Sequence, residues 1–379
     1  MPHVVATFTA VPVGQGDAFL LERADGKTIL VDGGRARTVF AAQLMLVRPT
    51  PAIDVAVCTH ADADHAEGLV GLLEASLAVV RDVWLPGRWT ERLVDLIVRP
   101  ADFLDELLTD VRAEQEAGSL ESPDAREGSE RGEDVDVDLD GVEAALGLED
   151  PLAPDILDGL ADGVWLPSTD LVGSARGALW IEAVQAAARI RKVARAAHHH
   201  GARIRWFDFE EARRRGTPAG GEAFLHPINS VELTAHMLRR KVSALRFLRL
   251  SVANRESLVF VAPEDPNNSA VIFSADSDLA SLRSVPATRT PLVTAPHHGA
   301  ETNAAAYGVI AASLPSGLDP QWVRSDGNYR KRPGATYLSG ANRVCTLCRA
   351  ASRPKQPVHL VDGPGGWQLA RGVQVCTCK

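Results

Sequence analysis

The chain of 379 residues has no long apolar run and few cysteines, and each shortage excludes a class of protein. No run approaches the roughly 18 apolar residues that a membrane-spanning helix needs, and the chain does not open with the charged and then apolar segment of a secretory signal peptide. We therefore expect a soluble, cytoplasmic protein. Cys58 is the only cysteine before residue 345, and its place in an apolar stretch predicts a buried side chain. The length allows one large domain with insertions, or two domains.

Acidic and basic residues are unevenly distributed within a net charge of −9. Residues 114–150 hold fourteen acidic side chains and two arginines, a net charge of −12. Because glycine and serine are interspersed, this segment cannot bury enough apolar surface to fold, and we predict a flexible acidic loop at about residues 114–140. Residues 321–379 have a net charge of +8, which favours a polyanionic substrate but also fits the ordinary solvated surface of an arginine-rich protein.

The most informative pattern is the His-x-Asp-x-Asp-His run of residues 60–65, which places four metal-capable side chains in six residues. It follows the apolar stretch 53–58, which predicts a short buried strand. The spacing of apolar residues in 66–73 predicts a helix directly after it. Imidazole nitrogens and carboxylate oxygens are ligands of Zn²⁺, Mn²⁺ or Fe²⁺, and a loop that leaves a strand can turn them toward one point. The run predicts a metal site, with a solvated acidic loop as the alternative.

Further candidate ligands also stand at the ends of apolar stretches. One stretch ends in Asp276, and another ends in His297 and His298. Near the N-terminus, residues 13–21 and 26–34 predict two strands of a meander, each closed by glycines that permit a tight turn. Each candidate ligand therefore ends a strand, so we expect the ligands at the edges of sheets.

In this order the segments resemble the metallo-β-lactamase superfamily, and within it the ComEC-like branch, the hydrolase domain associated with bacterial DNA-uptake proteins. The resemblance covers roughly residues 1–90 and 225–340 and implies an α/β fold, the αββα metallo-β-lactamase sandwich, with a metal site at the sheet edges. Without membrane helices, the chain differs from the full uptake channel. Six ordered motifs carry the resemblance: Gly14-Gln15-Gly16-Asp17-Ala18, Asp32-Gly33-Gly34, the run of residues 60–65, Asn254-x-x-Ser257-Leu258-Val259, Asp276 and Pro296-His297-His298-Gly299.

The resemblance implies two divalent metal ions, Zn²⁺ or Mn²⁺, with a carboxylate between them. Two such cations lower the pKa of a shared water and neutralise a phosphate or carbonyl oxygen during attack, so that no protein nucleophile is required. The implied ligands are His60 and Asp62 for one ion, Asp64 and His65 for the other, Asp276 as the bridge, and His297 or His298, the latter favoured, to complete a shell.

One departure from the family pattern affects catalysis. Members often carry a further histidine in an Asn-x-Tyr-Gly-His-Pro-like loop, where this chain has Arg332 before Pro333. An arginine cannot ligate a cation, so either the second metal is weakly bound or absent, or Arg332 contacts a phosphate in place of a ligand. We assign catalytic roles to Asp64 and to His297 or Arg332, the latter two as groups that stabilise developing negative charge.

Two segments lie outside the resemblance. Residues 90–225 predict a helical insertion, with helices at 90–108 and 174–200 on either side of the acidic loop. Residues 341–379 form a cysteine-rich tail. The pairing of its cysteines resembles a small zinc ribbon and predicts one structural Zn²⁺, with free thiols or disulfides as alternatives, at Cys345, Cys348, Cys376 and Cys378.

These patterns predict a metal-dependent hydrolase, a phosphodiesterase or nuclease that uses a metal-activated water. We expect nucleic acid as the substrate, with a smaller phosphoester as its nearest rival, and no membrane partner. The alternative is a catalytically weak or inactive scaffold of the same fold, a binding or regulatory protein whose acidic loop and basic tail engage a protein partner. The ligand set favours the enzyme, whereas Arg332 in place of a histidine favours the scaffold.

Overall fold

The computed structural model divides the chain into two compact units. The main unit comprises Met1–Gly87, Val193–Thr234 and Asn254–Lys379, and the second comprises Arg88–Lys192 and Ala235–Ala253. Within these, the structure describes residues 5–49, 51–87, 102, 106, 109, 175–233, 257–326, 332–347, 356–371 and 376–378. Four features predicted from the sequence lie wholly or mostly outside the described residues: the helix at 90–108, the acidic loop at about 114–140, Asn254 of the family motif, and Cys348.

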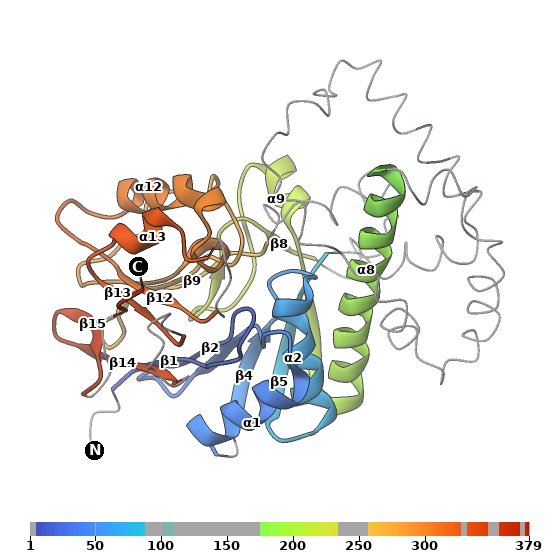
Figure 1. Cartoon of the computed structure of the whole chain (residues 1–379), viewed down its shortest axis with the longest axis horizontal. Coiled ribbons are helices and arrows are strands. Elements are labelled where there is room, and N and C mark those ends of the chain that lie inside the picture. Colours follow the sequence, from blue (N-terminus) through green and yellow to red (C-terminus); the bar gives the residue numbers. More distant parts are fainter. Residues whose placement is uncertain are drawn as a thin grey trace. The chain divides into compact units, whose positions relative to one another are not determined.

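Nine strands of the main unit form the first sheet (Figure 1). Its order is β15-β14-β1-β2-β3-β4-β5-β6-β8. Strands β3 to β6 are parallel, and the other neighbouring pairs are antiparallel. The strands are β1 (Thr7–Ala10), β2 (Phe19–Glu22), β3 (Thr28–Val31), β4 (Ala52–Val57), β5 (Val79–Pro86), β6 (Arg203–Asp208), β8 (Val231–Glu232), β14 (Val358–Gly363) and β15 (Gly366–Leu369).

Six shorter strands form the second sheet, in the order β13-β12-β11-β10-β9-β7. Strands β10 to β13 are parallel, and β9 and β7 extend the sheet in antiparallel pairing. The strands are β7 (His226–Pro227), β9 (Phe260–Ala262), β10 (Val271–Phe273), β11 (Leu292–Thr294), β12 (Gln321–Arg324) and β13 (Arg343–Cys345). Each sheet therefore contains a block of parallel strands, and the carboxyl ends of the strands in a block lie at the same edge of that sheet.

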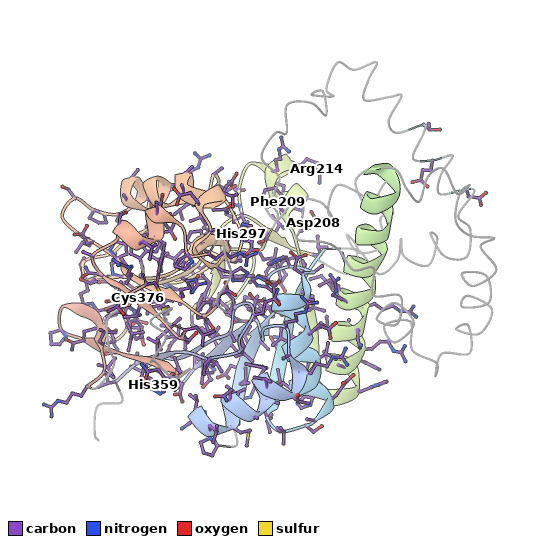
Figure 2. All side chains as sticks on the ribbon, viewed as in Figure 1. Asp208, Phe209, Arg214, His297, His359 and Cys376 are labelled. Carbon is purple, nitrogen blue, oxygen red and sulfur yellow. The ribbon has the colours of Figure 1, made fainter. Side chains whose placement is uncertain are left out.

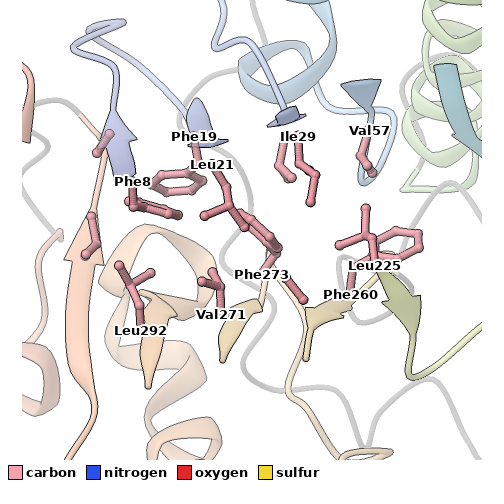
Figure 3. Packing of buried hydrophobic residues seen from close by; sticks show 14 of the residues in the cluster. Phe8, Phe19, Leu21, Ile29, Val57, Leu225, Phe260, Val271, Phe273 and Leu292 are labelled. Carbon is pink, nitrogen blue, oxygen red and sulfur yellow. The ribbon is translucent and has the colours of Figure 1, made fainter. Parts of the chain in front are cut away.

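Apolar side chains of both sheets form one core between them (Figure 3). Phe8 of β1 lies at its centre, with ring centroids 5.7 Å from Phe19 and 6.1 Å from Phe273 of the opposite sheet. Along β4, Val55 and Val57 point into this core, and alternation turns the buried Ala56 to the other face. Side chains from the inner faces of the two sheets therefore pack against each other, as in a β-sandwich.

Helices cover the outer faces. After β3 and β4 come α1 (Arg37–Val47) and α2 (Ala63–Glu74), and Gly68 of α2 packs so closely on Gly33 that a Cβ there would lie 1.8 Å from the Gly33 oxygen. A second apolar cluster joins the outer face of the second sheet to α12 (Ala304–Ser313) and α13 (Ala335–Ser339). The layer order is therefore αββα, and the predicted fold class is confirmed. The remaining helical elements are α8 (Ala175–His200), α9 (Phe209–Arg215), η3 (Pro296–Gly299) and η4 (Glu301–Asn303).

The sheets cross the domain boundaries that the sequence predicted. Strand β6, inside the predicted insertion 90–225, pairs in parallel with β5. Strands β14 and β15, inside the predicted tail 341–379, continue the first sheet next to β1. The boundaries were drawn from local composition, whereas strand pairing joins segments about 350 residues apart, such as Thr9 and His359.

Among the described helices, none has the length and apolarity to cross a membrane.

Candidate metal centre

The predicted ligands come from three strand ends. The segment from β4 into the first turn of α2 carries four of them, the loop after β10 carries one, and η3, directly after β11, carries two. The carboxyl ends of parallel strands are where α/β sheets usually hold their ligands. In chain order these residues are His60 and Asp62, Asp64 and His65, Asp276, and His297 and His298.

Asp276 stands at the middle of this cluster, and its two carboxylate oxygens face different partners. The side chain is 2% exposed. Its Oδ2 lies 3.5 Å from His60 Nε2 and 3.5 Å from His297 Nε2. Its Oδ1 lies 3.4 Å from His65 Nε2 and 3.6 Å from His298 Nε2. The carboxylate therefore separates the histidines into two groups, one for each oxygen.

Each group contains a further carboxylate. In the first, Asp62 Oδ2 lies 3.5 Å from His60 Nε2. In the second, Asp64 Oδ2 lies 3.4 Å from His298 Nε2, and the Nε2 atoms of His298 and His65 are 3.1 Å apart. Donor atoms bound to one Zn²⁺ at 2.0–2.2 Å are separated by roughly 3–3.6 Å. Donor atoms that all lie within 4.8 Å of one another come from His60, Asp62 and Asp276 on one side, and from Asp17, His65, His298 and Asp276 on the other, so these two sets suit a cation each, with Asp64 and His297 beside them.

Two buried polar atoms support the same conclusion. Among the described residues, His60 Nε2 and Asp276 Oδ1 have no hydrogen-bond partner, although both atoms are inaccessible to solvent. An unsatisfied buried polar atom costs about 1–3 kcal/mol. His60 Nε2 belongs to the first group and Asp276 Oδ1 faces the second, so a divalent cation in each group would satisfy one of these atoms, and the residues present fit metal ions.

In three of the histidines, a carboxylate or hydroxyl oxygen lies next to Nδ1, the ring nitrogen that faces away from Asp276. His65 Nδ1 lies 2.8 Å from Asp32 Oδ2, and because a carboxylate only accepts, Nδ1 carries the proton. Thr59 Oγ1 donates to Asp32 Oδ2 at 2.8 Å, so it accepts from His60 Nδ1 at 3.0 Å. His298 Nδ1 lies 3.0 Å from Asp17 Oδ1, as an ion pair without a hydrogen bond. The hydrogen bonds to Asp32 and Thr59 leave Nε2 of His65 and His60 facing Asp276, as in carboxylate–histidine–metal arrangements.

The backbone around the cluster is held in sparsely populated conformations. Asp32, Ala275, His297 and His298 have positive φ values of 59°, 46°, 47° and 52°. Such residues cost of order 1–3 kcal/mol each and concentrate at functional sites. The turn at His297 is fixed by its backbone N–H, which donates to the Ala275 oxygen at 2.9 Å, so the loops after β10 and β11 hold each other in place.

Charges within the cluster shift the pKa values of its members. Burial alone would raise the pKa of Asp276, but the four imidazoles around it hold the pKa well below its usual range. Burial and His65 lower the pKa of His60, yet Asp276 raises it to about 9. Burial also lowers the pKa of His298, yet Asp17 and Asp276 raise it to about 10. Without a cation, His60 and His298 are therefore protonated near neutral pH, and cation binding has to release those protons.

Arg332 lies beside the second group, where the family pattern has a histidine. Its Nη1 is 4.0 Å from Asp64 Oδ2 and 3.9 Å from Asp326 Oδ2, and its side chain is 22% exposed. Asp326 is fully buried, accepts from the Gly16 backbone N–H at 3.1 Å and pairs with the buried Arg324 at 2.9 Å. Burial would lower the pKa of Arg332, but the surrounding carboxylates raise it, so it carries a positive charge next to the metal ligands.

The structure thus brings together all seven predicted ligands and Arg332, and it places His297 and His298 in different groups where the sequence left a choice of one. Cys345, Cys376 and Cys378 lie elsewhere in the main unit, and Figure 2 shows Cys376 well apart from His297. Sequence reasoning gave no role to four polar residues of the centre, although the first two belong to its quoted motifs. Asp17, Asp32 and Thr59 lie beside the histidines, and Asp326 contacts the Gly16 backbone and Arg332. The sequence pattern that could have identified them is a carboxylate or hydroxyl residue at the end of an apolar strand, because burying such a group without a partner costs energy.

A match to one family model covers less than half of the chain. The family model described as the metallo-beta-lactamase superfamily matches residues 11–164. Proteins of this superfamily are mostly metal-dependent hydrolases, and their fold usually binds divalent metals. The match ends before β10, so the fold supplies the link to Asp276, His297 and His298. No curated protein matches the chain.

Proposed function

We propose that the protein is a metal-dependent phosphodiester hydrolase. The observation that carries the proposal is Asp276, a buried carboxylate with one oxygen toward each of two histidine groups. A carboxylate in this position is the expected bridge between two cations. The resemblance to the ComEC-like branch supports nucleic acid as the substrate, and a smaller phosphoester is the nearest alternative.

Two cations at this centre would supply an activated water and neutralise charge on the substrate. The protein contributes the alignment of its donors and a cationic side chain. Cys58, directly after β4, is an unsuitable nucleophile because its buried thiol donates to the His60 carbonyl oxygen and its pKa is raised by burial. Metal-activated water rather than a cysteine is therefore the expected nucleophile.

A phosphodiester fits the charge at the rim of the centre. Arg332 lies 4.0 Å from Asp64 and 3.9 Å from Asp326 and is 22% exposed, so its positive charge stands next to the ligands where a phosphate oxygen would bind. In this way it would offset developing negative charge where relatives use a histidine. Within the basic end of the chain, Arg324 is buried against Asp326, so it is not part of this rim.

The test compares Asp276→Asn with Asp278→Asn, a partly exposed residue two positions along the same loop. Hydrolysis of bis-p-nitrophenyl phosphate and of single-stranded DNA is followed with added Mn²⁺ or Zn²⁺, and bound metal is measured in each protein. We expect Asp276→Asn to lose at least 100-fold in rate, the scale of removing a group that stabilises transition-state charge, and to bind less metal, while Asp278→Asn keeps both. Undiminished hydrolysis by a folded Asp276→Asn protein would contradict the assignment.

A binding or regulatory scaffold is the second candidate, and Arg332 is the observation that favours it. A guanidinium in the place of a ligand would weaken metal binding to the second group if it contributed nothing to substrate binding. Metal content and hydrolysis rate, measured on the same protein, distinguish the enzyme from the scaffold. A protein that binds fewer than two ions at this centre and hydrolyses neither substrate supports the scaffold.

A further inference from the structure

Three cysteines meet on the far side of the second sheet from its core with the first. Cys345 ends β13, and Cys376 and Cys378 come from the last residues of the chain. All three are buried, at 6%, 5% and 3% exposure. We propose that Cys345, Cys376 and Cys378 bind one zinc ion as thiolates, at a structural site separate from the Asp276 centre.

The sulfur separations fit a shared cation and exclude a formed disulfide. Cys345 Sγ lies 3.4 Å from Cys376 Sγ and 3.9 Å from Cys378 Sγ. A disulfide requires about 2.05 Å between the sulfurs. Thiolates bound to tetrahedral zinc at about 2.3 Å are separated by roughly 3.8 Å. Each cysteine also offers a sulfur within 4.8 Å of the other two, so one ion can contact all three.

The backbone fixes these sulfurs from two directions. The Cys376 backbone N–H donates to the Arg343 oxygen at 3.0 Å, so the last segment of the chain is tied to β13. Cys345 is fixed by the pairing of β13 with β12. The site is therefore assembled by tertiary structure from segments 31 residues apart, as preorganised metal sites require.

The chemistry of the set selects zinc among common ions. Sulfur ligands in a buried, apolar setting favour soft or borderline cations, and three or four thiolates are typical of structural zinc. Calcium and magnesium prefer oxygen ligands, which this cluster lacks among the described residues. The fourth ligand predicted from the sequence, Cys348, lies outside the described residues and stays a prediction.

The cysteine site connects to the segment that carries Arg332. Tyr337 of α13 is buried beside the cysteines, and its hydroxyl donates to the Val344 oxygen of β13 at 2.8 Å. Its ring also packs near Gly299, the residue after His298, where a Cβ would lie 3.3 Å from the ring. A zinc ion at the cysteines would thus stabilise β13 and α13, which lie next to the loop of the Asp276 centre.

The experiment uses the full chain, purified with reductant and loaded with Co²⁺ in place of zinc. Cobalt bound to thiolates gives a sulfur-to-metal charge-transfer absorption that histidine and carboxylate ligands do not give. We expect this absorption in the wild type and in Asp276→Asn, its loss or large reduction in Cys376→Ser, and its retention in the matched control Cys58→Ser. Cys376→Ser should also bind one equivalent of zinc less than the wild type.

A second measurement does not depend on a folded variant. Titration of the zinc-loaded wild type with a thiol-selective mercurial reagent should release one zinc equivalent as the tail thiols react. Zinc that stays bound after these thiols are blocked, or a charge-transfer band unchanged in Cys376→Ser, would overturn the proposal. A disulfide found in the purified protein under reducing conditions, or iron or copper in place of zinc, would overturn it as well.

Discussion

Replacing Asp32 by asparagine should weaken metal binding without touching a predicted ligand. Asp32 is 1% exposed and accepts three hydrogen bonds, from the Thr59 backbone N–H, the Thr59 hydroxyl and His65 Nδ1, each at 2.8 Å. An asparagine has one accepting oxygen and an NH₂ group that only donates. With the oxygen kept on the Thr59 backbone, the NH₂ group would face His65 Nδ1.

The consequence is a change of tautomer. His65 Nδ1 would have to accept rather than donate, so its proton would move to Nε2, the nitrogen that faces Asp276 and His298. A protonated Nε2 cannot ligate a cation. Loss of such an orienting partner typically lowers metal affinity 10–100-fold, or about 1.4–2.7 kcal/mol. The metal-free protein should also lose about 1.5–3 kcal/mol, the contribution of a hydrogen bond to a charged group.

The assay is competition for Zn²⁺ with a chromophoric chelator, together with thermal unfolding of the metal-free protein. The matched control is Asp54→Asn, whose Oδ2 accepts from the Thr28 backbone N–H at 3.0 Å on β4, away from the ligands. We expect it to lower stability without changing metal affinity. Equal Zn²⁺ affinity for Asp32→Asn and the wild type, with both folded, would refute the orienting role of Asp32.

Three further predictions concern the same centre. Gly16→Ala should unfold the protein at a lower temperature than Gly26→Ala and reduce bound metal: both glycines have positive φ, but only at Gly16 would a Cβ meet the backbone of the first turn of α2, at 1.7 Å, whereas Gly26 has open space. Arg332→Ala should lower kcat/KM for bis-p-nitrophenyl phosphate by about 10–100-fold with bound metal unchanged, and Arg332→Lys should restore part of it; a loss of metal instead would show that the side chain supports the ligands. The metal-free protein should lose stability as the pH rises from about 6.5 to 9. The pKa of His60 is raised to about 9 in the folded protein, so the charge pair with Asp276 is complete below the ordinary value of 6.5 and is lost as His60 deprotonates, while Zn²⁺ affinity rises over the same range. Thermal unfolding with and without Zn²⁺ measures both effects, and a flat pH profile would contradict the charge assignment.

Local patterns predicted the elements that hold the centre. The apolar spacing predicted a strand at 53–58 and a helix at 66–73, and the structure has β4 at Ala52–Val57 and α2 at Ala63–Glu74. The alanine-rich segment 174–200 forms α8. These elements follow short-range rules, since apolar residues at a period of 2 or 3.6 have to face a core whatever the partner is.

The partners themselves were beyond the reach of such patterns. Strands β14 and β15 were placed in a tail because their neighbours in the sequence are cysteine-rich and basic, yet they pair beside β1. A strand of four to six residues carries too little information to name its neighbour. Burial against Phe8 and Trp367 in the shared core decides that pairing.

The sequence by itself determined the chemistry of this protein: histidine and aspartate at strand ends, a spacing that gathers four of them in one loop, and cysteines grouped near one end of the chain. The family resemblance added a bridging role for Asp276. Only the tertiary structure decided that the two oxygens of Asp276 face different histidine groups and that His297 and His298 fall one in each. It also decided that Asp32 fixes the proton on His65. Residue type and short spacing are local properties, whereas these contacts depend on two sheets that pack face to face and bring their strand ends to one point.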